Sequence, residues 1–171
     1  MKTDREPIDP HVAVGHVHLK VSDLERGVRF YRDALGFIEQ GRVGGTAAFL
    51  SAGDYHHHIA LNTWQSAGGA KPPPGSTGLY SFGIRYPTRA GLADAVRRLV
   101  AHDVEPARAS DHGVCESVYL EDPDGNGVEL YWDRPRECWP QTADRRLAVI
   151  DVPLDLGAVL DGGDEDDCDP A

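Results

Sequence analysis

Three segments of the sequence carry side chains that could bind a divalent metal ion. The first, GHVHLK, places His16 and His18 at alternate positions, the second reads YHHHIALN, and the third, GVELYWD, contains Glu129. Imidazole nitrogens and carboxylate oxygens are common ligands of divalent metals. Two histidines with one carboxylate form the open site of non-haem Fe(II) oxygenases. These residue types therefore favour a metal centre with coordination positions free for small molecules.

Each candidate also has an ordinary structural interpretation. A single histidine in a strand is more often a satisfied polar group than a ligand, and the three consecutive histidines of the second segment suit a solvated surface. His112, in the loop ASDHGV, is compatible with solvent exposure, and Tyr119 with the core. Glu129 stands out because a carboxylate between Val128 and Leu130 is costly to bury unless it is paired or bound to a metal.

Apolar residues recur with the periods of two similar β-α-β-β-β patterns, one on each side of a linker rich in Gly and Pro. Alternation predicts strands, a spacing of three to four residues predicts helices, and clusters of Gly, Pro, Asp and Asn predict turns. The first pattern contains strands at 11–21, 47–51 and 55–63 and a helix over 24–35. The second contains strands at 79–86, 115–121 and 128–132 and a helix over 89–100.

These patterns predict an α+β protein in which two βαβββ modules form a curved mixed sheet around a cavity. The helices and the apolar strand faces pack together, so the other strand face lines the cavity. On strand 55–63, His58 shares a face with Ala60, whereas His57 lies on the opposite face. The predicted segments are a disordered leader (1–10), the first module (11–64), a linker (65–78), the second module (79–140) and an acidic tail (141–171).

Composition excludes several classes of function. The 171 residues include 17 basic and 28 acidic side chains, which gives a formal net charge of −11, and no basic patch suggests nucleic-acid binding. No apolar run approaches the roughly 20 residues that a membrane span needs, and the first residues do not resemble a signal peptide. Three cysteines without metal or redox spacing predict free thiols in a reducing compartment, and hence a cytoplasmic location.

Three longer segments carry a family resemblance: GHVHLKVSDLERGVRFYRDALGF, YHHHIALNTW and YLEDPDGNGVELYWDRP. They resemble the vicinal oxygen chelate superfamily, which includes glyoxalase I, bleomycin and fosfomycin resistance proteins and extradiol dioxygenases. SDHGV followed by the third segment is similar to the catechol 2,3-dioxygenase-like branch. The resemblance implies that His16 and Glu129 are the first and last metal ligands. It also implies that His112 transfers protons near bound oxygen and that Tyr119 hydrogen-bonds the substrate.

The sequence departs from this family at the third ligand. The family places a histidine on the first strand of the second module, in a pattern like LYHFAI, but the segment here reads LYSFGI and has Ser81 at that position. A serine hydroxyl is a poor ligand for such a metal. Three outcomes remain open: His58 replaces the missing ligand, two protein ligands bind a metal weakly, or the site is metal-free.

The resemblance implies an extradiol-type dioxygenase that uses Fe(II), or Mn(II), to cleave a small catechol-like aromatic with O2, and it suggests a homodimer. His18, Ser81 and Tyr131 are expected to line the substrate pocket. One alternative is a lyase or isomerase of the glyoxalase or epoxide-opening type, although Ala60 stands where glyoxalase-type members have a fourth ligand. The others are a cofactor-free oxygenase and a protein that sequesters an aromatic drug.

Overall fold

The fold is described from a computed structural model for residues 7–148 and 150–161. The first module forms a four-stranded sheet of order β1-β4-β3-β2, in which β1 is parallel to β4 and the other pairs are antiparallel. Its elements are β1 (Val17–Lys20), α1 (Leu24–Arg29), a π-helical continuation η1 (Phe30–Ala34), β2 (Ile38–Val43), β3 (Ala47–Ser51) and β4 (Ile59–Asn62).

The second module repeats this order and adds one strand at its edge. The sheet has the order β5-β8-β7-β6-β9, and β5 is again parallel to the last strand of its module. Its elements are β5 (Phe82–Tyr86), α2 (Arg89–Ala101), β6 (Arg108–Asp111), β7 (Cys115–Glu121), β8 (Gly127–Asp133), a short 3-10 helix η2 (Arg136–Cys138), β9 (Val152–Pro153) and α3 (Leu156–Leu160).

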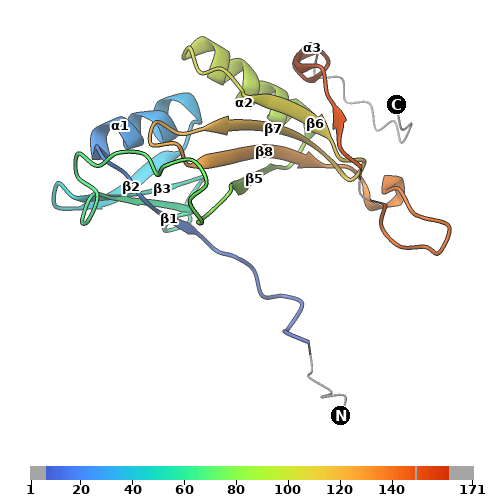
Figure 1. The fold of residues 1–171 in the computed structure, drawn as a ribbon, viewed down its shortest axis with the longest axis horizontal. Helices are drawn as coiled ribbons and strands as arrows, with labels where there is room; N and C mark the ends of the chain where they lie inside the picture. Colours follow the sequence, from blue (N-terminus) through green and yellow to red (C-terminus); the bar gives the residue numbers. More distant parts are fainter. Residues whose placement is uncertain (1–6, 149, 162–171) are drawn as a thin grey trace.

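Helices α1 and α2 lie on the same side of the two sheets (Figure 1). One hydrophobic core runs under both helices and includes Val28 and Tyr31 from the first module and Val96 and Leu130 from the second, all at most 1% exposed. We call the sheet surface opposite the helices the open face. The predicted α+β class, with paired βαβββ patterns around an open face, is confirmed.

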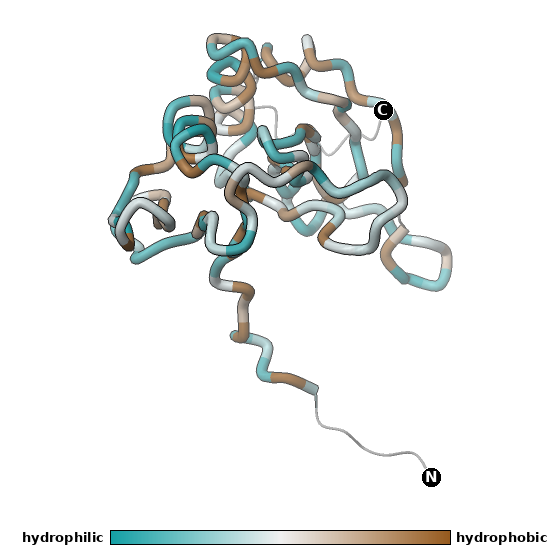
Figure 2. Tube along the Cα trace, turned by 60° about the vertical axis from the view of Figure 1, so that its left-hand side comes forward, coloured by the Kyte–Doolittle hydropathy of each residue, from teal (hydrophilic) through white to brown (hydrophobic). Residues whose placement is uncertain are grey.

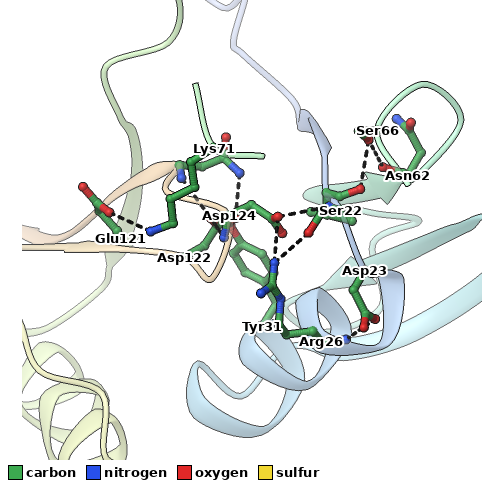
Figure 3. Close-up of polar contacts among 12 residues, drawn as sticks. Ser22, Asp23, Arg26, Tyr31, Asn62, Ser66, Lys71, Glu121, Asp122 and Asp124 are labelled. Atoms are coloured by element: carbon green, nitrogen blue, oxygen red, sulfur yellow. Dashed lines mark hydrogen bonds and ion pairs between the residues drawn. The ribbon is translucent and has the colours of Figure 1, made fainter. Parts of the chain in front are cut away.

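The turn between β7 and β8 joins the two modules. Tyr31 donates a hydrogen bond from its hydroxyl to Asp122 Oδ2 at 2.9 Å, and Asp122 Oδ1 accepts from the backbone amides of Asp124 and Asn126. Asp124 Oδ1 in turn accepts from the Ser22 amide and the Arg26 guanidinium (Figure 3). The sequence DPDGNG therefore does more than form a turn, because its buried carboxylates hold the first helix against the second sheet.

The helix predicted over 24–35 forms as expected. The Asp23 side chain accepts from the Arg26 amide and caps its start, and Gly36 ends it at φ +82°, a conformation that glycine adopts without strain. The strand predicted at 11–21 is shorter, however, because only Val17–Lys20 pairs with a neighbour. The strand predicted at 55–63 likewise begins at Ile59, so the three consecutive histidines lie in the loop before it.

Strands β2 and β6 were missed by the sequence pattern. Strand β2 lies at the edge of its sheet with only intermediate or exposed residues, so it lacks the apolar alternation that predicts a strand. Strand β6 is four residues long and mostly polar, which removes the same signal.

The two ends of the described chain are structured differently: residues 7–16 are extended, whereas the predicted tail contributes a strand and a helix. Residues 7–16 contain no helix or strand and extend away from the body, with Val14 96% exposed (Figure 2). At the other end, β9 pairs with β6, and α3 packs against α2 and buries Val159 completely. The predicted disorder of residues 1–6 and 162–171 lies outside the described residues.

One cysteine prediction is wrong. Cys115 is a free thiol, but Cys138 is disulfide-bonded, because sequence spacing alone does not reveal which cysteines meet in the fold. None of the helices described is both long and apolar enough to cross a membrane.

Candidate functional site

The open face of the second sheet gathers several of the predicted residues through strand alternation. On β8, Val128, Leu130 and Trp132 are buried in the core, so Glu129 and Tyr131 point to the open face. Strand pairing then sets Glu129 opposite Tyr119 on β7, and Tyr119 opposite Arg108 on β6. The side chains of Arg108, Tyr119 and Glu129 therefore lie in one row across strands β6, β7 and β8.

A hydrogen-bonded chain connects His112, Tyr119 and Glu129. His112 Nε2 is 2.8 Å from the Tyr119 hydroxyl oxygen, and that oxygen is 2.9 Å from Glu129 Oε1. Ser117, two residues before Tyr119 on the same strand, donates to the same carboxylate oxygen at 2.7 Å. The structure thus brings together three of the residues singled out in the sequence and adds Ser117, which the alternation of CESVYLE could have placed beside Tyr119.

The hydrogen bonds that link His112, Tyr119 and Glu129 limit where the hydrogen atoms lie. His112 Nδ1 is 3.0 Å from the Ile150 carbonyl oxygen, and since a carbonyl oxygen only accepts, that nitrogen carries a hydrogen. Together with the Tyr119 contacts to His112 and Glu129, this makes three hydrogen bonds. A neutral imidazole and a phenol supply only two hydrogens, so the Tyr119 hydrogen serves either His112 Nε2 or Glu129 Oε1 at any one time.

Tyr119 is held in its neutral form. Burial and the hydrogen bond to Glu129 raise the pKa of its hydroxyl to about 12, although the nearby Arg108 guanidinium acts in the opposite direction. At neutral pH this hydroxyl is therefore a hydrogen-bond donor and not a phenolate. The Tyr119 hydroxyl can therefore orient a polar group of a ligand that lies beside Glu129.

The first module contributes a second group of candidates around a larger cavity. This cavity, of about 610 Å³, is lined by His16, His58, Ser81 and Tyr131, among other residues. A smaller cavity of about 260 Å³ is lined by Ser81 and Tyr119. Ser81 thus borders both spaces and lies where the two groups of predicted residues approach each other.

The histidines of the first module make contacts that the sequence did not reveal. His16 packs against His57, with ring centroids 4.6 Å apart, and His57 also contacts Phe49. The prediction that His57 faces away from the site is wrong, because residues 55–58 lie in a loop where strand alternation does not apply. Burial and neighbouring histidines, His56 first among them, lower the pKa of His57.

His58 lines the larger cavity, but one ring nitrogen is already engaged. Its Nδ1 is 2.9 Å from Ser51 Oγ and accepts from the Ala52 backbone amide at 3.3 Å. A neutral imidazole that accepts at Nδ1 carries its hydrogen on Nε2. Before Nε2 could bind a metal, the hydrogen would have to move to Nδ1 and the contact with the Ala52 amide would have to open.

His18 lies apart from the other candidates. Its Nε2 is 2.9 Å from Asn62 Nδ2, its ring packs edge-on against Trp64, and it lines a separate cavity of about 440 Å³. The prediction that His18, Ser81 and Tyr131 share one pocket remains a prediction for His18, whereas Ser81 and Tyr131 do line the same cavity.

The candidate ligands fit a metal in chemistry more clearly than in position. Imidazole and carboxylate donors suit Fe(II) or Mn(II), and Glu129 Oε2 makes no hydrogen bond to the described residues. Within residues 7–148 and 150–161, however, no three His, Cys, Asp or Glu side chains are grouped closely enough to hold a metal ion. The ligand set His16, His58 and Glu129 stays a prediction.

Comparisons with known proteins place this geometry in a family. The model of the Glyoxalase/Bleomycin resistance protein/Dioxygenase superfamily matches residues 13–130. The chain belongs to this superfamily, as the sequence resemblance predicted.

Two relatives are named as dioxygenases. The chain is 33% identical over 159 residues to a catechol-2,3-dioxygenase of Bacillus subtilis (strain 168), covering 92% of this chain and 54% of the relative. It is 32% identical over 126 residues to biphenyl-2,3-diol 1,2-dioxygenase 3 of Rhodococcus globerulus, covering 74% of this chain and 65% of the relative. The chain therefore spans between about half and two thirds of these relatives' lengths.

Solved structures agree on the fold. A glyoxalase/dioxygenase from Nostoc punctiforme superposes with a TM-score of 0.62 at 20% identity, covering 77% of this chain and 99% of that one. Lactoylglutathione lyase from Agrobacterium tumefaciens gives a TM-score of 0.56 at 24% identity, covering 72% and 96%. Proteins with different activities thus share this vicinal oxygen chelate architecture.

Proposed function

We propose that the protein is an extradiol-type dioxygenase that cleaves the ring of a catechol-like aromatic with O2. The observation that carries this proposal is the hydrogen-bonded chain of His112, Tyr119 and Glu129, in which Tyr119 lines the smaller cavity. The names of the two curated relatives support the same class of reaction. A protein that only sequestered an aromatic molecule would gain little from a carboxylate tied to a tyrosine and a histidine.

His16, His58 and Glu129 are the residues that would hold Fe(II), or alternatively Mn(II). The bound metal would supply the Lewis-acid and one-electron chemistry that couples a diol to dioxygen. Ser81 lines both cavities and leaves room where a bulkier imidazole would stand.

The chain's own residues would bind the substrate and move protons. His112 Nε2 can accept the proton of a substrate hydroxyl once Tyr119 turns its hydrogen toward Glu129, and the Ile150 carbonyl keeps Nδ1 protonated meanwhile. Tyr119 remains neutral and orients the second hydroxyl of the diol. Tyr131, on the wall of the larger cavity, offers an aromatic surface for the ring.

Metal content and oxygen uptake test this proposal together. Protein purified without oxygen or chelators is analysed for metal against protein concentration, loaded with Fe(II) anaerobically, and mixed with a panel of catechols in an oxygen electrode. Near-stoichiometric metal and uptake of one O2 per catechol consumed are expected. Protein that retains no metal and consumes no oxygen, yet binds an aromatic stoichiometrically, would overturn the proposal and favour a metal-free binding protein.

We also propose that the active form is a homodimer. In the isolated chain Val12 is 60% exposed and Val14 96% exposed on the extended segment 7–16, and Tyr80, beside the cavities, is 85% exposed. We propose that a second copy of the chain covers these side chains. Sedimentation equilibrium is expected to give twice the mass of one chain, and a monomer at all concentrations would contradict this.

A further inference from the structure

Arg108 lies at the β6 end of the row that it forms with Tyr119 and Glu129 on the open face. Strand pairing sets it opposite Tyr119, and its guanidinium carbon lies 4.1 Å from the centroid of the Tyr119 ring. This stacking holds a positive charge over the face of the residue that is bonded to His112 and Glu129. No local sequence pattern pointed to Arg108, because strand β6 was not predicted.

Part of the Arg108 guanidinium has no hydrogen-bond partner among the residues that the structure describes. Its Nη1 donates to Ser110 Oγ at 2.8 Å and lies 3.5 Å from Asp151 Oδ1, on a carboxylate that is itself 58% exposed. Its Nε and Nη2 groups donate to none of the described residues. The side chain is 44% exposed, so these two donors are open to a ligand, and a guanidinium binds a carboxylate best through two such parallel hydrogen bonds.

The unpaired donors border a cavity of suitable size. Arg108 and Tyr119 line the space of about 260 Å³ that also touches Ser81. This volume is below the usual size of a pocket for a whole drug-sized ligand and suits a charged substituent of the ring. The acidic residue on its wall, Glu121, forms an ion pair with Lys71 at 3.4 Å. Arg108 is thus the cation placed to meet a negative group in this cavity.

We infer that Arg108 binds a carboxylate on the substrate, and that the substrate is a catechol-type aromatic acid and not a neutral catechol. This inference rests on the proposed function, because it names the substrate class of the same site. Since the chain carries a formal net charge of −11, its overall field does not attract an anion. A preference for an acid must therefore come from a local cation, and a planar guanidinium is better matched to a carboxylate than an ammonium group.

Equilibrium binding to the metal-free protein tests this without any turnover. Titration calorimetry compares 3,4-dihydroxyphenylacetate and 3,4-dihydroxybenzoate with their methyl esters, which keep the ring and the diol but lose the charge. One of the acids is expected to bind wild-type protein at least about tenfold more tightly than its ester. Arg108→Gln should remove this preference, and Arg108→Lys should retain part of it.

The ratio of acid to ester separates ligand binding from a structural role. If Arg108 only positioned Tyr119, Arg108→Gln would weaken acid and ester alike and leave their ratio unchanged. Arg32→Gln is the matched control, because Arg32 has nearly the same side-chain exposure (43%) and pairs with Asp33 on helix η1. This variant should keep the wild-type ratio.

Each result separates this inference from the proposed function. Equal binding of acids and esters, no binding of any of them at millimolar concentration, or an unchanged ratio in Arg108→Gln would overturn the role of Arg108. Oxygen uptake with neutral catechols would leave the dioxygenase proposal standing in that case. Conversely, a charge preference that depends on Arg108 in a protein that never consumes oxygen would support the anion site and overturn the dioxygenase.

Discussion

His112 Nε2 and the Tyr119 hydroxyl oxygen are 2.8 Å apart, although the two residues come from a turn and from the middle of a strand. The contact depends on elements far along the chain. Ile150, next to the edge strand β9, accepts from the other ring nitrogen of His112. The segment after residue 140 therefore takes part in the site, because it fixes which imidazole nitrogen faces Tyr119.

Replacing His112 by Asn should remove the group that transfers the proton. We expect kcat for oxygen uptake to fall by about 10²-fold, which is the usual contribution of a general acid–base residue, while the metal content stays unchanged. Stopped-flow or electrode measurements on Fe(II)-loaded protein check this. His102→Asn, at the end of α2, is the control and should behave as wild type. A His112→Asn variant with full activity would exclude its catalytic role.

Stability should decrease in alkaline solution because three tyrosines have raised pKa values. Burial raises the pKa of Tyr86 and Tyr119 to about 12, and it raises the pKa of Tyr31 well above the usual value near 10. Because the folded state favours the neutral phenols, their contribution is complete below about pH 10 and is lost as the pH rises toward the folded-state pKa values.

Urea unfolding at a series of pH values measures this loss. The free energy of unfolding of wild type should fall from about pH 10 upward, and Tyr119→Phe should show a shallower fall. An identical slope in the variant would show that the Tyr119 hydroxyl titrates as an exposed phenol does.

The sequence predicted those parts of the fold that depend on local patterning. Alternation around Glu129 assigned its face correctly, and the cap at Asp23 with Gly36 bounded the first helix. It failed where pairing and not burial makes a strand, as in β2 and β6. Arg108, on β6, was missed as a site residue for that reason, because only the strand register brings it beside Tyr119. Ser117 lies on the predicted strand 115–121, and its importance comes from a hydrogen bond to Glu129 on the neighbouring strand.

The assignment of the histidines shows a second limit of prediction from sequence patterns. Period-two reasoning was extended four residues too far before β4, and it therefore placed His57 on the wrong side. A tertiary contact such as that between Tyr31 and Asp122 spans 91 positions and leaves no mark in either local sequence. The role of the DPDGNG turn in joining the modules could be seen only in the fold.

Tyr31→Phe tests how much the contact between Tyr31 and the DPDGNG turn contributes to stability. The substitution removes the hydrogen bond to Asp122, a residue 2% exposed, while Asn126 Nδ2 still donates to the same carboxylate oxygen. We expect a loss of about 1–2 kcal/mol in the free energy of unfolding. Urea denaturation at neutral pH measures it, with Tyr55→Phe as the control because Tyr55 is 44% exposed. Equal midpoints for all three proteins would show that the bond adds nothing to stability.

Two substitutions test whether a metal binds beside Ser81, and through which ligands. Ser81→His restores the imidazole that the family resemblance places at this position, and it should tighten Fe(II) or Mn(II) binding by at least about tenfold, or roughly 1.4 kcal/mol. His58→Ala should weaken binding in the parent protein if His58 is the substitute ligand. In the Ser81→His background the same change should have little effect, because the site would no longer need that donor. Calorimetric titration of the four proteins gives the coupling between the two positions.

If His58→Ala changes nothing in either background while Ser81→His still tightens binding, His16 and Glu129 hold the metal with the help of solvent and substrate, and His58 is a cavity-lining residue.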